Sequence, residues 1–236
     1  MSTIYMVRHG QASFGKENYD QLSQRGREQS RVLAEYLMRT GLSFDAVYAG
    51  DMVRQKDTAH EILSVYREHD RAPTELSVLS EFNEYSSRDI IIAHIHDVAN
   101  EDPSLETDLK NIYTDNKAFQ RVFEKIMMRW ISGDADKAGV VRWQDFCGRV
   151  RSGLRRVMAD NGRKKNILIC TSGGPISAAV QMALGLSDER ALRIAWHIVN
   201  TSVTKFVYDD EQMALTGFNQ AAHLELQSDP GWVTYR

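Results

Sequence analysis

A short apolar strand that ends in Arg-His-Gly is the feature that most constrains this chain. Ile4 to Val7 predict the strand, and Arg8, His9 and Gly10 follow it directly. Arg8 brings a permanent charge on a planar fork of donors, and His9 brings a nitrogen that can attack or exchange protons near neutral pH. Gly10 permits a tight turn. Because ligands bind at the carboxyl ends of strands in open α/β sheets, we expect a site here, although the segment alone fits simple capping of a strand equally well.

The length and composition are typical of one α/β domain with room for an inserted subdomain. The chain has 236 residues, of which 42% are hydrophobic and 26% charged. The net charge of −3 gives no general attraction to nucleic acid or to an anionic membrane, so we expect neither partner, and any anion site must be a local cluster.

The sequence gives no sign of a metal site, a cofactor or a membrane anchor. The cysteines, Cys147 and Cys170, lie too far apart for a metal motif. Arg8 interrupts the only apolar segment near the start, and no run approaches the roughly 20 apolar residues of a membrane span. We therefore predict a cytoplasmic protein that binds no metal and no cofactor.

A second cationic side chain follows the next predicted strand, residues 46–49. Gly50 and Asp51 open a helix, with Asp51 as the expected N-cap, and Arg54 lies in its first turn. A lone arginine on a helix is usually solvated. Together with Arg8 at the end of another strand, however, it would match the oxygens of one phosphate group.

Two acidic residues follow a third predicted strand, residues 75–79. Glu81 and Glu84 are both placed where a carboxylic acid could protonate the leaving oxygen of a phosphate ester. The sequence then changes character, and residues of about 86–141 show apolar residues at helical spacing, most clearly in 119–131. We interpret this region as a helical insertion over the site. His94 and His96 within it are interpreted as structural or solvated.

A further buried strand, residues 166–170, leads into Thr171, Ser172, Gly173 and Gly174 and then a helix. The amide groups at the start of that helix can donate to an anion, and so can the Ser172 hydroxyl.

Taken in order, these segments resemble the histidine phosphatase (phosphoglycerate-mutase-like) superfamily over the whole chain apart from the insertion. Arg8-His9-Gly10 matches its signature, and Leu22-Ser-x-x-Gly-x-x-Gln29 resembles its Leu-Thr-x-x-Gly-x-x-Gln. Asp51-Met-Val-Arg54-Gln55-Lys-Asp-Thr-Ala59 resembles its Asp-Leu-x-Arg-Ala-x-x-Thr-Ala, and Leu79-Ser-Glu81 fits its Leu-x-Glu pattern. The resemblance implies one domain, 1–236, built as a three-layer α/β sandwich with a mostly parallel central sheet flanked by helices.

The resemblance also implies a function and a role for each matching residue. His9 would be the nucleophile of a metal-independent phosphatase that passes through a phosphohistidine, and Glu81, or alternatively Glu84, would be the proton donor. Arg8, Arg54, Ser172 and Gly173 would bind the phosphoryl group. The partner would be a phosphorylated small molecule, with phosphate as product or inhibitor.

The chain departs from the superfamily pattern at Ser172. The pattern there is Ser/Thr-His-Gly-Gly, and this chain has Thr171-Ser172-Gly173-Gly174, so a cationic donor is lost. We therefore expect weak or absent activity, and a gain in Ser172→His unless the surroundings have repacked. Three alternatives stay open: a silent member that binds a phosphorylated ligand or a protein, a mutase, and a serine hydrolase with an incomplete Gly-x-Ser-x-Gly elbow. Gly15 also replaces a common Asn, for which Ser13 or Asn18 could substitute.

Overall fold

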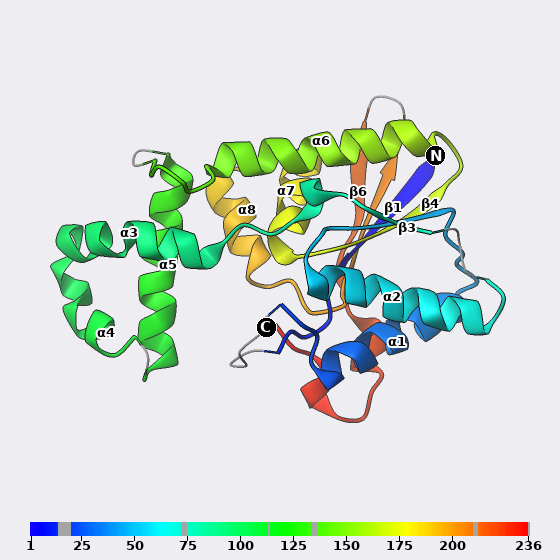
Figure 1. The fold of residues 1–236 in the computed structure, drawn as a ribbon, viewed down its shortest axis with the longest axis horizontal. Coiled ribbons are helices and arrows are strands. Elements are labelled where there is room, and N and C mark those ends of the chain that lie inside the picture. The colour runs from blue at the N-terminus through cyan, green and yellow to red at the C-terminus, as the bar shows by residue number, and fades with distance from the viewer. Residues whose placement is uncertain (14–19, 72–74, 113, 134–135, 210–211, 236) are drawn as a thin grey trace. The chain divides into compact units, whose positions relative to one another are not determined.

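The computed structural model describes residues 1–13, 20–71, 75–112, 114–133, 136–209 and 212–235 (Figure 1). These residues form two compact units. The first joins Met1–Glu84 to Arg149–Arg236, and the second is Tyr85–Gly148. The catalytic candidates His9, Glu81 and Glu84 and the phosphate-binding candidates all belong to the first unit.

A mixed sheet forms the centre of the first unit. Its described strands lie in the order β3-β2-β4-β1-β5-β6. Strands β3, β2, β4 and β1 are parallel to one another, whereas β5 is antiparallel to β1 and β6 to β5. The strands are β1 Ser2–Arg8, β2 Ala46–Ala49, β3 Leu76–Val78, β4 Asn166–Thr171, β5 Val203–Tyr208 and β6 Met213–Gln220.

Helices cover both faces of this sheet, which gives the α/β sandwich expected from the sequence. In Figure 1, α1 and α2 lie on one side, and α6 and α7 lie on the other. Apolar side chains of α1 and α2, such as Leu33 and Ile62, pack with Val47 and Leu168 of the sheet. The helices with residues in this unit are α1 Gln24–Arg39, α2 Val53–Glu68, η1 Ser80–Phe82, α6 Trp143–Asn161, α7 Gly173–Leu184, α8 Asp188–Ala195, α9 Ala222–Glu225 and η3 Pro230–Trp232.

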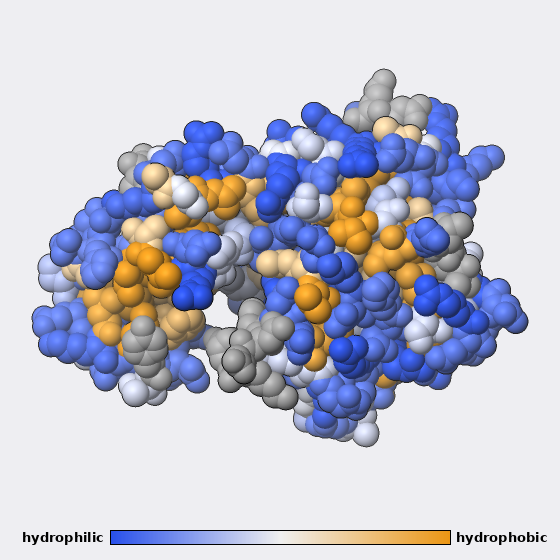
Figure 2. Space-filling model, in the orientation of Figure 1, coloured by the Kyte–Doolittle hydropathy of each residue, from blue (hydrophilic) through white to orange (hydrophobic). Residues whose placement is uncertain are grey.

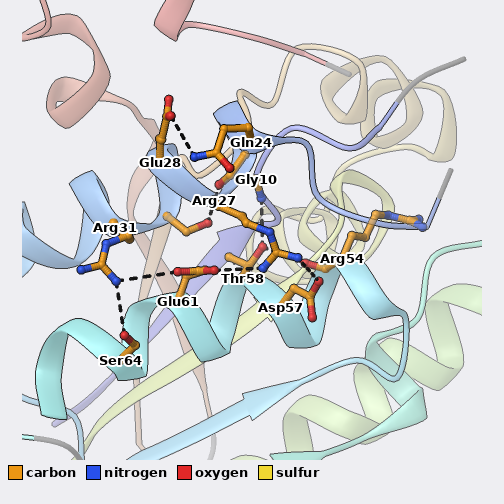
Figure 3. Close-up of polar contacts among 12 residues, drawn as sticks. Gly10, Gln24, Arg27, Glu28, Arg31, Arg54, Asp57, Thr58, Glu61 and Ser64 are labelled. Atoms are coloured by element: carbon orange, nitrogen blue, oxygen red, sulfur yellow. Dashed lines mark hydrogen bonds and ion pairs between the residues drawn. The ribbon is translucent and has the colours of Figure 1, made fainter. Parts of the chain in front are cut away.

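Ion pairs join α1 to α2 along their outer side (Figure 3). Arg27 donates to Glu61 at 2.9 Å and to Asp57 at 3.2 Å, and Arg31 lies 3.8 Å from Glu61. Because Arg27 and Arg31 are half exposed, these pairs contribute little stability compared with the apolar contacts beneath them.

The second unit is helical, as the spacing of its apolar residues predicts. Its aromatic side chains Tyr85, Trp130, Trp143 and Phe146 pack together, with ring centroids 4.8–5.7 Å apart. This cluster gives the unit a hydrophobic core of its own. The helices are α3 Ser87–Glu101, η2 Pro103–Leu105, α4 Glu106–Lys110, α5 Asn116–Ser132 and the first residues of α6. The position of this unit over the site stays a prediction.

The expected N-cap of α2 is wrong. The helix begins at Val53 with Met52 as its cap residue, and the Asp51 carboxylate pairs with Lys56 at 2.8 Å. The carboxylate that accepts a hydrogen bond from the helix N-terminus is Asp20, whose Oδ2 lies 2.9 Å from the Val53 amide nitrogen. A side chain far away in the sequence has thus taken the place that local sequence rules assign to Asp51.

The surface of the first unit is mainly hydrophilic on the face shown in Figure 2, with smaller hydrophobic areas between the charged side chains. Among the described residues, the helices are all too short or too polar to cross a lipid bilayer.

Candidate functional site

Three strands of the sheet end side by side and bring their following residues together. Arg8 pairs with Thr171 in the register of β1 and β4, and Ala49 of β2 pairs with Cys170. The His9 amide donates to the Thr171 carbonyl at 2.7 Å, and the Gly50 amide donates to the Cys170 carbonyl at 3.2 Å. His9, Gly50 and Ser172 therefore leave the sheet as neighbours, at the edge where α/β folds bind ligands.

His9 is held as a neutral imidazole with one defined nitrogen available for attack. Its side chain is 4% exposed. Burial lowers the pKa of His9 well below its usual value, and the charges of Arg54 and then Arg8 lower that pKa further. The Nδ1–H group donates to the Gly10 carbonyl at 2.8 Å, so the lone pair is on Nε2. This is the protonation state that a histidine nucleophile requires.

Arg54 lies directly against that nitrogen. Its Nε–H donates to His9 Nε2 at 3.1 Å, and its Nη1 forms an ion pair with Asp20 at 2.6 Å. Arg54 is 6% exposed. Because a buried guanidinium needs an anionic partner, Asp20 keeps this charge beside His9 when no ligand anion is present.

The backbone of the Arg-His-Gly turn is fixed from three directions. The Gly10 amide donates to Thr58 Oγ1 at 3.0 Å (Figure 3). The Asn200 side chain donates to the His9 carbonyl at 3.0 Å, and the Thr201 amide donates to the Arg8 carbonyl at 2.9 Å. Thr201 makes this bond with φ = +57°, a strained value for a β-branched residue.

Arg8 binds backbone carbonyls of the C-terminal part of the chain. Its Nη1 donates to the Ile198 carbonyl, and its Nη2 donates to the Tyr235 carbonyl at 2.8 Å. Its charge also lowers the pKa of His9, after burial and the charge of Arg54. Arg8 therefore contributes to the electrostatics of the site while it fixes the segments around residues 198 and 235.

Ser172 is buried and bonded to Gln55, and its hydroxyl does not cap the helix that follows. The Gln55 Nε2–H group donates to Ser172 Oγ at 2.7 Å and to the Phe82 carbonyl at 3.1 Å. Gly173 opens α7, where a Cβ atom would come within 2.9 Å of the Ala195 carbonyl oxygen. The close approach explains why a glycine follows Ser172.

The two candidate acids lie in different surroundings. Glu84 accepts a hydrogen bond from the Gly174 amide at 3.0 Å, in the first turn of α7 and two residues from Ser172. The Glu81 carboxylate instead lies 3.5 Å from Arg156 of α6. Arg149 donates to the Asn83 carbonyl at 2.8 Å; burial lowers the pKa of Arg149, and the carboxylates of Glu84 and Glu81 oppose that shift.

Several residues of the site were not found from the sequence: Asp20, Gln55, Thr58, Asn200 and Arg149. The sequence signal that could have identified one of them is at Gln55, where the superfamily pattern has Ala.

Gly15 and Asn18 lie outside the described residues. Ser13 is described and is buried, with its amide bonded to the Gln21 carbonyl at 2.8 Å. In the described part of the chain, His, Cys, Asp and Glu side chains do not gather in threes in a way that could hold a metal ion.

A mixed sheet between two layers of helices, with its candidate site at the carboxyl ends of β1, β2 and β4, defines an α/β protein of the phosphoglycerate-mutase-like type. The family model of the histidine phosphatase superfamily (branch 1) matches residues 4–111 and 106–221. The chain belongs to that superfamily.

Solved structures of superfamily members show the same fold. Phosphoglycerate mutase from Bacillus anthracis is 18% identical, with 94% of each chain covered and a TM-score of 0.64. A mutant phosphoserine phosphatase from Entamoeba histolytica, in complex with phosphoserine, is 18% identical over 95% of this chain and all of that one, with a TM-score of 0.64. Mycobacterial glucosyl-3-phosphoglycerate phosphatase, in complex with VO3, is 18% identical over 93% of this chain and 99% of that one, with a TM-score of 0.64. No curated protein shows significant sequence similarity to the chain.

Proposed function

We propose that the protein is a phosphomonoester hydrolase that acts through a phosphohistidine on His9. The observation that carries the proposal is the neutral imidazole whose Nε2 faces Arg54 at the carboxyl edge of the sheet. A nitrogen in this state is a nucleophile, and the two arginines near it match the charge that spreads over a transferring phosphoryl group. The fold neighbours include phosphatases and a mutase, and one of them was solved with phosphoserine bound, which supports a small phosphorylated substrate.

The reaction proceeds in two displacements. His9 Nε2 attacks the phosphorus, the N–P bond forms, and the bond to the leaving oxygen breaks as a carboxylic acid gives that oxygen its proton. Water then attacks the phosphorus and passes a proton to the carboxylate, and the N–P bond breaks to release phosphate and neutral His9. Arg54 gives up its bond to Nε2 when the phosphoryl group arrives, and it then donates to a phosphoryl oxygen.

The resemblance implies Glu81 as the proton donor, with Glu84 as the alternative, but we assign the proton transfer to Glu84 because of its place beside Ser172. Glu84 is bonded to the first turn of α7 beside Ser172, whereas Glu81 is paired with Arg156. The test compares Glu84→Gln with Glu81→Gln on an alkyl phosphate and on p-nitrophenyl phosphate, whose leaving group needs little protonation. General acid catalysis contributes about 10²–10⁴-fold, so Glu84→Gln should slow the alkyl ester far more than the aryl ester. A selective loss in Glu81→Gln instead would move the role to Glu81.

Hydrolysis itself is tested on a panel of phosphomonoesters in the presence of a chelator, with His9→Ala as the matched control. Phosphate release by the natural protein, and its loss in His9→Ala, is the expected result. Absence of turnover on the whole panel, with tight binding of inorganic phosphate, would support the silent binder that Ser172 makes a specific alternative. Exchange of phosphate between positions of 3-phosphoglycerate without its release would identify a mutase.

A further inference from the structure

Two positions at which this chain departs from the superfamily pattern contact each other. The pattern has Ala after the arginine of the second motif, and this chain has Gln55; the pattern has His where this chain has Ser172. The residues are 117 positions apart in the sequence, yet Gln55 Nε2 lies 2.7 Å from Ser172 Oγ. Both side chains are buried, with exposures of 0% and 1%.

The two departures compensate in size. A change from Ala to Gln adds as many non-hydrogen atoms as a change from His to Ser removes. Because protein interiors are close-packed, a histidine at 172 and a glutamine at 55 would compete for the same buried space. On its other side, the Gln55 side chain packs against Gly50. Only glycine leaves room for it there, since a Cβ atom at Gly50 would lie 2.0 Å from Gln55 Oε1.

The hydrogen bonds also fix which way the Gln55 amide and the Ser172 hydroxyl point. The Phe82 carbonyl can only accept, so the amide nitrogen of Gln55 must face it, and the same nitrogen donates to Ser172 Oγ. With this lone pair of Oγ occupied, and with no acceptor for the hydroxyl proton within the described part of the chain, that proton can donate to a ligand oxygen. The donation from Gln55 also polarises that hydroxyl.

The carbonyl oxygen of the Gln55 side chain shows that this orientation of the amide costs stability. Gln55 Oε1 is buried and accepts no hydrogen bond within the described part of the chain. A buried acceptor without a donor destabilises a fold, so packing alone does not explain a glutamine here.

We propose that Gln55 is a positioning residue that aims the Ser172 hydroxyl at a phosphoryl oxygen, and that the Gln55–Ser172 pair replaces the missing imidazole as a neutral donor. The proposal rests on the proposed function for its catalytic consequence. The structural coupling between the two residues does not depend on that function.

Two double-mutant cycles test the proposal. If Gln55 acts through Ser172, Gln55→Ala and Ser172→Ala should each lower kcat by about 10-fold or more, toward the range for one preorganised donor, with little change in KM. The double variant should then be no worse than Ser172→Ala alone. The matched control is Gln29→Ala, another buried glutamine that is bonded to Gln11, Trp232 and Thr234 instead. Its effect on unfolding should add to that of Ser172→Ala.

The second cycle uses Ser172→His. In the single variant Ser172→His, the imidazole and the Gln55 side chain compete for the same space, so kcat should not rise. With Gln55→Ala it should regain space and exceed the single variant about 10-fold or more, and the activity of the double variant should acquire a new pH dependence as the imidazole titrates. An equal gain in Ser172→His with and without Gln55→Ala, or simple additivity in both cycles, would overturn the proposal.

The Gln55–Ser172 proposal can be tested even if the phosphatase proposal fails. If neither the natural protein nor any variant hydrolyses a phosphomonoester, the same cycles are measured by the affinity for inorganic phosphate and by the unfolding transition. Non-additive effects of positions 55 and 172 on phosphate affinity support the paired donor even in a silent binder. Additive effects on phosphate affinity contradict it, whatever the catalytic result.

Discussion

The ends of β1 and β4 are neighbours in the sheet, but they relate to the superfamily pattern in opposite ways. At β1 the pattern's residue types are kept: the pKa of His9 is lowered, Arg54 donates to its Nε2, and Thr58 Oγ1 accepts a hydrogen bond from the Gly10 amide. At β4 the pattern's histidine is replaced by Ser172, and Gln55 of α2 donates a hydrogen bond to the Ser172 hydroxyl. The difference teaches that two neighbouring strand ends of one site need not follow the pattern together: the β1 end keeps its residue types, whereas the β4 end has a bonded Gln55–Ser172 pair where the pattern has an imidazole.

Among the changes that compare the two strand ends, the largest effect is expected from Arg54→Gln at the β1 end. This change removes the cation that contacts Nε2, and kcat should fall about 10²–10³-fold. It also removes a charge that lowers the pKa of His9, so that pKa should rise. Because only neutral His9 attacks, the activity of the variant should begin to fall at a higher pH than that of the natural protein as the solution is acidified.

Arg27→Gln is the matched control, because Arg27 carries the same group but pairs with Asp57 and Glu61 on the outside of α2. Its kcat and pH profile should be unchanged, and its free energy of unfolding should fall by less than about 1 kcal/mol. A pH profile of Arg54→Gln that coincides with that of the natural protein would show that Arg54 does not control the protonation of His9.

Thr58→Val tests how much the protein depends on the hydrogen bond between the Gly10 amide and Thr58. Thr58 Oγ1 is the acceptor that the structure provides for the Gly10 amide. Valine has the same shape without the acceptor, so a buried donor is left unsatisfied at a cost of about 1–3 kcal/mol in unfolding free energy. Chemical denaturation measures this, and kcat should fall with it because the turn carries His9.

Thr171→Val is the corresponding change at the β4 end, and its effect should be smaller. Thr171 Oγ1 donates to the Phe82 carbonyl at 2.7 Å, but Gln55 donates to the same carbonyl. The acceptor therefore keeps a partner, and we expect a loss of about 1 kcal/mol or less in unfolding free energy. If Thr171→Val destabilised the protein more than Thr58→Val, the contrast between the Phe82 carbonyl, which has two donors, and the Gly10 amide, which has one acceptor, would be wrong.

The sequence predicted those parts of the molecule that depend on local pattern. The strand before Arg8, the strand before Ser172 and the helix over 119–131 follow from apolar periodicity and from the residues that end each segment. Arg8 and His9 were singled out because their residue types are costly to place at a strand end without a function, and Arg54 because it follows the neighbouring strand and matches the superfamily pattern.

The remaining parts of the site depend on contacts that no local pattern encodes. Asp20 bonds to Arg54 and to the start of α2, although 33 positions separate it from Val53. Gln55 meets Ser172 through the order of the strands, and Glu84 reaches Gly174 across 90 positions. Within its own segment, each of these side chains is an ordinary polar residue. It finds its partner because the pairing of β2, β4 and β1 brings distant segments together.

Trapping of the phosphoenzyme tests the central claim most directly. The natural protein is mixed briefly with a ³²P-labelled phosphomonoester, quenched in alkali because phosphohistidine is labile in acid, and mapped by mass spectrometry. The account predicts label on His9 at Nε2, lost on acid treatment and absent from His9→Ala. Label on Ser172, or label that persists in His9→Ala, would contradict it.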